Sequence, residues 1–347
     1  MAAMRRAARR ALPRGARVNV IAFDGVCLGD GPTTGVGRAF LDGLHAYAGR
    51  ADADCVLLVP AGANRPTISG LRCVDAPRGS VRRQRELPRL LRDVGADLLH
   101  SSVAAVPLRA PCPTIATVHD LPWLHPEAAE RSSWWRRFAT RRSLRSATRV
   151  IAPSSMSAED AQRCIGHGGA KVEVVPHGVA SPTLPRLDED RRDGPLLILG
   201  DDRPRKNRAR LIAALEEIPR DDRPTLRFVG PPDDYVTEHE KHDLLRTCRG
   251  VVHVSRFEGF GLPALEALAH GAPLLCADLP PLREVAGDVA AYVDPDDTRA
   301  IAEGLAKVHR DRALRARQVT DGPKRAARFS LQRLADSWLR IHREVLT

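Results

Sequence analysis

The sequence predicts an α/β protein with two doubly wound domains in tandem. Its 347 residues exceed the roughly 250–300 residues that a single hydrophobic core organises. Short apolar, β-branched runs alternate with longer amphipathic stretches along the whole chain, which indicates parallel sheets covered by helices on both faces. No apolar run reaches the ~18–20 residues of a membrane span. We therefore expect a globular protein with two cores.

The first domain is predicted over residues 17–180. Helical patterns such as 38–48 and 136–147 separate its strand-like runs. These runs lie at residues 18–23, 55–60, 97–102, 114–120, 149–154 and 172–178. Residues 1–16 are basic and rich in alanine, without the continuous apolar segment of a secretory signal. We interpret them as a frayed leader of a cytoplasmic protein.

A Pro-rich and charged stretch without periodicity, residues 181–195, is the predicted linker. The alternating pattern then restarts in a second domain over residues 196–328. Its strand-like runs lie at residues 196–200, 227–230, 251–255, 273–278 and 290–294. Residues 329–347 place apolar side chains three and four positions apart, which predicts one amphipathic helix. We expect this helix to cross back to the first domain.

The charge and the cysteines limit the classes of partner. The formal net charge is +11, and the whole excess of Lys and Arg lies in residues 1–180. This asymmetry indicates an anionic partner such as a membrane surface or an acidic acceptor, unless the arginines only cover solvated faces. Seven cysteines, an odd number with no CxxC pair, argue against a disulfide framework.

Residues 255–273, SRFEGFGLPALEALAHGAP, combine the features of an anion site. A buried strand precedes them, and a helix is predicted to begin near Leu262, with Pro263 in its first turn. In open α/β sheets, ligands bind beyond the carboxyl ends of the strands, where this loop lies. Gly259 and Gly261 allow backbone N–H groups to approach a ligand, and the helix N-terminus favours a phosphate.

Two carboxylates, Glu258 and Glu266, flank this predicted phosphate site. Because carboxylates facing a phosphate would repel it, we expect them to accept hydrogen bonds from hydroxyl groups instead. Their separation along the helix axis is too large for them to share a proton. A nucleoside diphosphate sugar offers the required order of groups: a ribose diol, a diphosphate and then sugar hydroxyls.

These residues resemble the donor-site signature of retaining glycosyltransferases of family 4. The segment 258–297 carries the similarity, and the spacing from Glu258 to Glu266 matches the E-x7-E motif of that family. Similar segments follow the family order over nearly the whole chain, at residues 35–38, 117–122, 150–160, 174–179 and 199–207. The resemblance implies a GT-B fold, with two Rossmann-like domains and the active site in the cleft between them.

The resemblance assigns the donor to the second domain and the acceptor to the first. Glu266 is implied to hold the ribose hydroxyls and Glu258 a hydroxyl of the transferred sugar. The loop between them is implied to contact the sugar and phosphate through the backbone of Gly259, Phe260, Gly261 and Leu262.

Positive charge is needed at the donor diphosphate, because departure of the nucleotide builds negative charge there. Lys206, with Arg205 beside it, suits this task. Gly35 and Gly37, placed between the first strand and its helix, are expected to let the backbone approach the diphosphate. The segment 35–40 lacks the third glycine of a dinucleotide fingerprint, so no nicotinamide cofactor is predicted.

The predicted catalytic residues are His119, Asp120 and Glu258. His119 ends a strand, and the resemblance places it near the reacting centre. Asp120 is a candidate to orient His119, to bind the acceptor or to cap the following turn. The family mechanism we adopt as a hypothesis is front-face attack, in which the donor phosphate takes the proton of the acceptor. No metal or cofactor is predicted, because no DxD-like motif stands at a strand end.

The sequence leaves the substrates open. Residues 231–250 lack the further strand and helix that the family commonly has near the nucleotide base, so UDP and GDP remain alternatives, as do mannose-like and glucose-like sugars. The acceptor is a lipid-linked, glycan or small molecule. His177 stands where the family usually has asparagine, near the hinge, and we expect this change to be silent.

Other classes of function were weighed against this one. A nucleotide-sugar hydrolase or epimerase fits the same fold. A non-catalytic basic protein that binds nucleic acid has no motif to support it, and aromatic residues are only 4% of the chain. The basic stretches 78–92 and 131–149, the second with Trp134 and Trp135, indicate peripheral contact with an anionic membrane on its inner face, or solvated helix faces.

Overall fold

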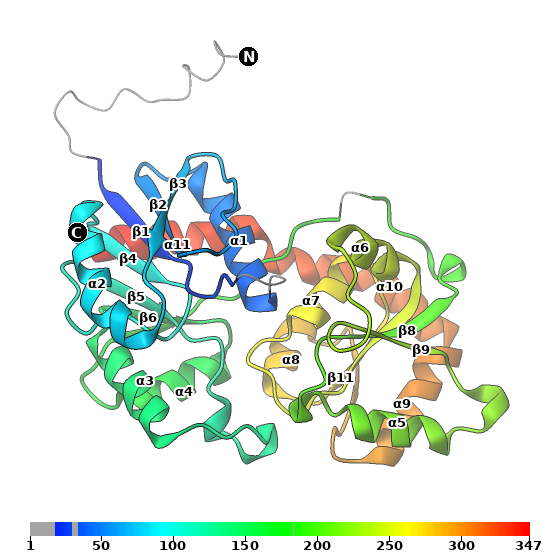
Figure 1. The fold of residues 1–347 in the computed structure, drawn as a ribbon. Coiled ribbons are helices and arrows are strands. Elements are labelled where there is room, and N and C mark those ends of the chain that lie inside the picture. The colour runs from blue at the N-terminus through cyan, green and yellow to red at the C-terminus, as the bar shows by residue number, and fades with distance from the viewer. Residues whose placement is uncertain (1–17, 30–33, 183) are drawn as a thin grey trace, which may run out of the picture.

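The computed structural model describes residues 18–29, 34–182 and 184–347, and it contains two parallel sheets flanked by helices (Figure 1). The predicted leader, residues 1–16, lies outside the described residues. The first sheet has the strand order β3-β2-β1-β4-β5-β6-β7. Its strands are β1 (Val20–Asp24), β2 (Asp54–Pro60), β3 (Leu71–Ala76), β4 (Leu98–Ser101), β5 (Thr114–Thr117), β6 (Arg149–Ala152) and β7 (Lys171–Val174).

The second sheet has the order β12-β11-β10-β8-β9, and its paired strands are also parallel. Its strands are β8 (Gly194–Leu199), β9 (Leu226–Val229), β10 (Cys248–His253), β11 (Leu274–Ala277) and β12 (Ala291–Val293). The strand order reverses direction between β1 and β4 in the first sheet and between β8 and β10 in the second. Ligands of open α/β sheets bind at such reversal points, beyond the carboxyl ends of the strands.

Helices cover both sheets. The first half has α1 (Gly35–Ala48), α2 (Ser80–Asp93), α3 (Trp134–Ser146) and α4 (Ser155–Ile165). The second half has α5 (Arg208–Glu217), α6 (Glu238–Thr247), α7 (Leu262–Ala269), α8 (Pro280–Ala286), α9 (Thr298–Arg310), α10 (Arg312–Ala326) and α11 (Leu331–Leu346). Short 3-10 turns occur at Pro122–Leu124, Pro126–Ala128, Glu189–Arg191, Pro204–Lys206, Arg220–Asp222 and Ala327–Phe329. Within the described ranges, none of the helices has the length and apolar character that crossing a bilayer requires.

The prediction of two doubly wound α/β domains is confirmed, and each predicted strand run contains a strand. One strand was missed. β3 lies at the edge of its sheet and carries partly exposed side chains along most of its length, so its residues lack the apolar run of a buried strand. β8 begins at Gly194, within the stretch that we expected to be a linker.

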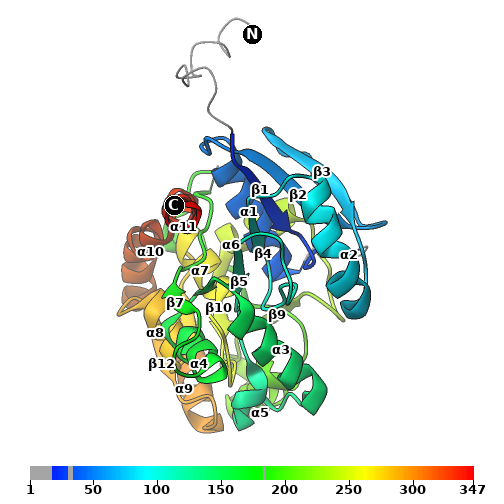
Figure 2. The ribbon, with the colours of Figure 1, turned by 90° about the vertical axis from the view of Figure 1, so that its left-hand side faces the viewer.

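The C-terminal helix α11 lies against the first sheet beside α1, although it follows directly on the helices of the second half (Figures 1 and 2). Its apolar face contributes Leu334, Trp338 and Ile341 to the core around Phe23. The α1 helix makes room for it at Gly43, where a Cβ atom would lie 2.6 Å from the Trp338 ring. This packing ties the C-terminal helix to the first sheet.

A chain of hydrogen bonds runs through this core from α11 to the end of β4. The Tyr47 hydroxyl donates to His342 Nδ1 (2.7 Å), and His342 Nε2 donates to His100 Nδ1 (3.0 Å). His100 Nε2 then donates to Thr117 Oγ1 (3.3 Å), whose hydroxyl donates to the Ser101 carbonyl (2.8 Å). One choice of neutral tautomers satisfies every bond, so both buried histidines are uncharged.

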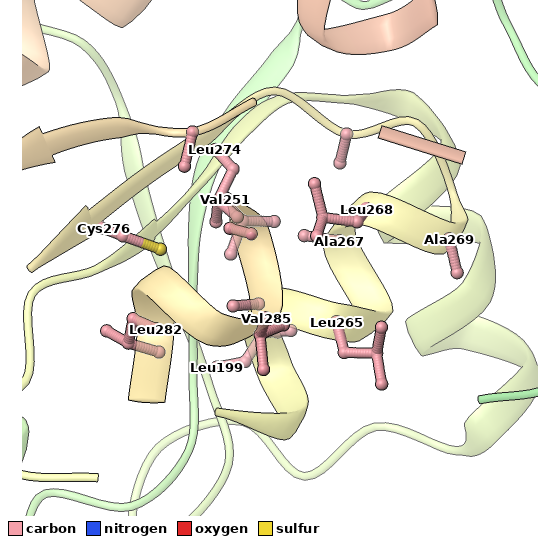
Figure 3. Close-up of a cluster of buried hydrophobic side chains, with 14 of the residues drawn as sticks. Leu199, Val251, Leu265, Ala267, Leu268, Ala269, Leu274, Cys276, Leu282 and Val285 are labelled. Atoms are coloured by element: carbon pink, nitrogen blue, oxygen red, sulfur yellow. The ribbon is translucent and has the colours of Figure 1, made fainter. Parts of the chain in front are cut away.

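Helix α7 is anchored in the core of the second half (Figure 3). Leu265 and Leu268 of α7 are buried among side chains from β10, β11 and α8, including Val251, Leu274 and Leu282. A helix buried on this scale has little freedom to shift, because interiors are close-packed. The start of α7 is therefore held in a fixed position at the carboxyl edge of the sheet.

Replacing Gly43 with alanine tests the packing of α11. We expect Gly43→Ala to lower the free energy of unfolding by about 1–3 kcal/mol, because the added methyl overlaps the Trp338 ring. Gly49→Ala at the end of the same helix is the matched control, since a Cβ there meets no atom within 4 Å. Denaturant titration measures both. Equal stabilities of the two variants would contradict the packing.

The buried histidines predict a loss of stability in mild acid. Burial lowers the pKa of His100 to about 3 and that of His342 well below its usual range. The unfolded chain takes up these protons below about pH 6.5, whereas the folded chain does not, so stability is full above this pH and falls below it. We expect His100 alone to account for about 2 kcal/mol between pH 7.5 and pH 5.

Denaturant titrations at the two pH values measure this dependence. His100→Gln should be less stable than the natural protein at pH 7.5 and should show a shallower dependence on pH. His239→Gln, at a side chain that is 80% exposed, should leave the dependence unchanged. If His100→Gln keeps the pH dependence of the natural protein, groups other than His100 cause that dependence.

Candidate active site

A cleft of about 440 Å³ lies between the carboxyl edges of the two sheets. This volume falls within the range of about 300–1,000 Å³ that small-molecule sites have. Its walls come from α1 and the ends of β5 and β7 in the first half, and from the ends of β8, β9 and β10 with α6 and α7 in the second. Of the predicted site residues, the cleft is lined by Gly35, His119, Asp120, Arg205, Lys206, Glu258, Gly259, Phe260, Gly261, Leu262 and Glu266.

The loop after β10 touches the first half of the molecule at Gly259. A Cβ atom on Gly259 would lie 2.1 Å from the His119 carbonyl oxygen, so only glycine fits there. The Gly259 carbonyl accepts hydrogen bonds from the hydroxyls of Ser154 (2.6 Å) and Ser157 (3.1 Å), at the start of α4. We predicted Gly259 for close approach to a ligand, whereas its contact in the structure is with the other half of the chain.

The first turn of α7 lies at the wall of this cleft. Gly261 precedes the helix with φ of 101°, a conformation that favours glycine, and no side chain from the described residues caps the first turn. Leu262 and Pro263 both line the cleft. Uncapped amides and the helix dipole together make this turn an attractive place for an anion.

Lys206 lines the same cleft and is held by the structure around it. It ends the 3-10 turn after β8, and Asn207 pins that turn by donating to the carbonyls of Val254 (3.1 Å) and Pro295 (2.6 Å). The Lys206 ammonium donates to Glu258 Oε1 at 2.7 Å. A lysine ammonium has three N–H donors, so Lys206 can bind an anion without releasing Glu258.

Glu258 is buried and ionised. Burial acts to raise the pKa of Glu258, but the Lys206 ammonium, and after it His253, hold this pKa well below its usual range. His253 Nε2, at the end of β10, lies 3.2 Å from Glu258 Oε1. A carboxylate in this state accepts hydrogen bonds and is not a proton donor at neutral pH.

Arg205 faces the first half of the molecule. Its guanidinium lies 3.4 Å from Asp120 Oδ2 and 3.0 Å from Glu130 Oε1, and the residue is buried. Asp120 therefore takes a role that we had not proposed for it, as an ion-pair partner across the cleft. Arg205 lines the cleft, but two carboxylates already compensate its charge.

Glu266 is at the centre of a second ionic group. Lys241 of α6 donates to Glu266 Oε1 at 2.6 Å and lies 3.1 Å from Glu238. Arg38 of α1 reaches across from the first half to Glu238 (2.5 Å) and lies 3.9 Å from Glu266. Two cations thus stand next to Glu266, at the position where we expected ribose hydroxyls.

His119 has a partner on each ring nitrogen. Its Nε2 donates to the Ser102 carbonyl (2.8 Å), so Nδ1 of the neutral ring accepts from His177 Nε2 (3.2 Å), with the two rings stacked. Burial lowers the pKa of both rings, that of His177 to about 3. In this arrangement His119 is a neutral side chain that lines the cleft, and neither of its ring nitrogens is free for proton transfer.

His177, where we expected a silent change, lines the cleft and contacts the catalytic candidate His119. Gly37 differs from prediction. It lies inside the first turn of α1, and its amide donates to Thr34 Oγ1 (3.2 Å), so this amide is not available to a diphosphate. Gly35 begins the same helix and does line the cleft.

Sequence reasoning did not assign Arg38, Lys241 and His253 to the site. Arg38 and Lys241 lie next to Glu266 from other helices, so sequence spacing gives no signal for these pairs. His253 lies at the end of the strand that leads to Glu258, so its closeness in the sequence was an available signal. His177, a histidine at a strand end where the family commonly has asparagine, was a second one.

The state of His119 is measurable. We expect its ring to be neutral and protonated on Nε2 at pH 7, because burial lowers its pKa and the Ser102 carbonyl requires a donor. Long-range nitrogen–proton NMR correlations distinguish the two tautomers from the cation. His119→Gln identifies the signals of this ring. A cationic His119 at pH 7 would contradict the geometry.

Comparison with known proteins identifies the family of the chain. Residues 4–181 match Glycosyltransferase Family 4, and residues 234–325 match Glycosyl transferases group 1. The chain is 26% identical over 255 residues to O-antigen chain mannosyltransferase B of Escherichia coli, an alignment of 62% of this chain and 66% of that protein. It is 25% identical to MMP alpha-(1->4)-mannosyltransferase of Mycolicibacterium hassiacum, over 67% of this chain and 66% of that protein.

Solved structures share the arrangement of both sheets. Sucrose-phosphate synthase from Thermosynechococcus elongatus superposes with a TM-score of 0.74 at 18% identity, covering 94% of this chain and 98% of that chain. Anabaena HepE, solved in complex with UDP-glucose, superposes with a TM-score of 0.68 at 16% identity, covering 94% of this chain and 99% of that chain. WaaG, a glycosyltransferase involved in lipopolysaccharide biosynthesis, superposes with a TM-score of 0.73 at 16% identity, covering 92% of this chain and 99% of that chain. The chain has the GT-B fold and belongs to glycosyltransferase family 4.

Proposed function

We propose that the chain is a retaining hexosyltransferase that moves a mannose-like or glucose-like residue from a nucleoside diphosphate sugar to a lipid-linked, glycan or small-molecule acceptor. One observation carries the proposal. The Lys206 ammonium and the uncapped first turn of α7 lie together at the edge of the second sheet, with Glu258 and Glu266 on either side. A nucleoside diphosphate sugar requires this order: positive charge for the diphosphate in the middle, and a carboxylate on each side for the hydroxyls of the sugar and the ribose.

In the proposed complex the diphosphate lies between Lys206 and the start of α7. Glu258 then accepts from a hydroxyl of the sugar, and Glu266 accepts from the ribose. The base lies against the loop before α6, where Tyr235 is 59% exposed and lines the cleft. In this complex the Glu266 carboxylate keeps its ion pairs with the neighbouring cations and also accepts a hydrogen bond from a ribose hydroxyl.

The proton of the acceptor is proposed to pass to the donor phosphate. Glu258 is ionised and paired with Lys206, and both nitrogens of His119 have partners, so none of these groups is placed to act as a base or nucleophile. A phosphate oxygen of the leaving nucleotide stands beside the sugar carbon and gains charge as the bond breaks. Attack on the same face of the sugar as departure retains the anomeric configuration.

The relatives support this choice of substrates without deciding it. Two curated relatives are mannosyltransferases, which favours a mannosyl donor. A GT-B neighbour was solved with UDP-glucose, so both GDP and UDP remain in the proposal. No group of three or more His, Cys, Asp or Glu side chains in the described ranges is arranged to hold a metal ion, and we propose metal-independent transfer through Lys206 and α7. Peripheral contact with an anionic membrane is part of the proposal.

Thermal denaturation with a panel of UDP, GDP, ADP and their sugars tests the donor site. The nucleotide that binds should raise the melting temperature, because a ligand of the folded state stabilises it. Lys206→Met should weaken this nucleotide about tenfold to a hundredfold, as expected for loss of a charge-assisted hydrogen bond. Lys307→Met, at an exposed lysine of α9, is the matched control. Unchanged binding by Lys206→Met would overturn the assignment.

Donor turnover without an acceptor separates the transferase from the hydrolase. A transferase should consume its nucleotide sugar slowly in water and faster when a suitable acceptor is supplied. Consumption that is equally fast with and without acceptors would replace the transferase by a nucleotide-sugar hydrolase, while leaving the donor site in place.

A further inference from the structure

Helix α3 exposes a cluster of aromatic side chains that the active site does not use. Trp134, Trp135 and Phe138 are 74%, 61% and 54% exposed, and Trp134 is the most exposed large apolar side chain of the described residues. Their rings touch one another, with centroids 5.3 Å apart for the tryptophans and 5.7 Å apart for Trp135 and Phe138. Exposed apolar clusters of this kind mark interaction sites.

The same helix is strongly basic. Residues 131–149 contain seven arginines and no Asp or Glu. Arg136, Arg141 and Arg142 are exposed, and none of them has a carboxylate partner in the part of the chain that the structure describes. Their charges are therefore uncompensated, in contrast to the paired arginines of the cleft.

The helix geometry places the aromatic and basic side chains on one face. Ser133 caps the helix, and Ser143 and Leu144 are its buried residues, which fixes the side that faces the protein. At 100° per residue, the opposite side carries the aromatic residues in the first turns and the arginines in the later ones. We define the α3 face as the exposed side chains Trp134, Trp135, Phe138, Arg141, Arg142 and Arg145.

We propose that the α3 face docks on the surface of an anionic lipid bilayer. Tryptophan rings favour the headgroup region, where one side is apolar and the other wet. Arginine guanidinium groups bind phosphate oxygens in pairs. A second copy of the chain would present the same positive charge and be repelled, so the charge of the α3 face favours an anionic partner. This inference rests on the membrane contact named in the proposed function and assigns it to a surface, and its test does not depend on the nucleotide sugar.

The α3 face begins close to the cleft. Glu130, four residues before Trp134, lies 3.0 Å from Arg205, which lines the cleft. The connecting residues include an exposed Arg131. Docking through the α3 face therefore brings the bilayer surface near the rim of the cleft, on the side of the first sheet.

Vesicle flotation tests the proposal without any activity measurement. The full chain should float with vesicles of phosphatidylcholine and phosphatidylglycerol in 0.1 M salt, where the screening length is about 10 Å, and much less in 1 M salt, where it is about 3 Å. Vesicles of phosphatidylcholine alone should bind less. Absence of salt-sensitive binding to the anionic vesicles would overturn the proposal.

Two variants locate the binding. Trp134→Ser/Trp135→Ser/Phe138→Ser should lose most vesicle binding while keeping the melting temperature, because all three side chains are exposed. Arg141→Gln/Arg142→Gln should weaken binding about fivefold for each arginine. Arg220→Gln/Arg317→Gln removes the same charge from exposed positions of the second half and should bind like the natural chain.

The remaining outcomes are also decisive. If the α3 variants float as well as the natural chain, the α3 face is not the docking surface. If the natural chain ignores vesicles but self-associates, and the triple aromatic variant is monomeric, the face is an interface between copies instead. Either result contradicts membrane docking.

Discussion

The contact between Gly259 and the backbone of His119 positions the site. It joins the loop after β10 of the second sheet to the end of β5 in the first, and a single added carbon at Gly259 would meet the His119 carbonyl at 2.1 Å. Two serine hydroxyls at the start of α4 bind the Gly259 carbonyl. Because Glu258 precedes this contact and α7 follows it, both are held at a defined distance from the first sheet.

Charge compensation across the cleft follows from this arrangement. Lys206 pairs with Glu258 and Lys241 with Glu266, while Arg205 spans the cleft to Asp120. Partly buried charges require such partners, since desolvation without them is costly. Burial lowers the pKa of His119 and His177, which line the same cleft. A diphosphate entering the cleft thus meets cations that are already oriented by carboxylates, which is the condition for selective binding of a substrate that carries both phosphates and hydroxyls.

The fold and the loop that precedes α7 were predictable because their signals are local. Apolar runs indicated the strands, and Pro263 with the flanking glycines indicated the start of α7. The partners of the site residues were not predictable, since Arg38, His177 and Lys241 reach the site from separate elements. Gly37 shows the same limit: its spacing resembled a ligand loop, but Thr34 caps the helix there and takes its amide. The edge strand β3 escaped prediction because it is half exposed.

The most direct test of this account is a crystal structure of the chain with the nucleoside diphosphate that stabilises it. We expect the diphosphate within hydrogen-bond distance of Lys206 Nζ and of the backbone amides at the start of α7, with the ribose at Glu266. A nucleotide bound outside the cleft, or one whose phosphates lie away from both Lys206 and α7, would contradict the central claim that this edge of the second sheet is the donor site.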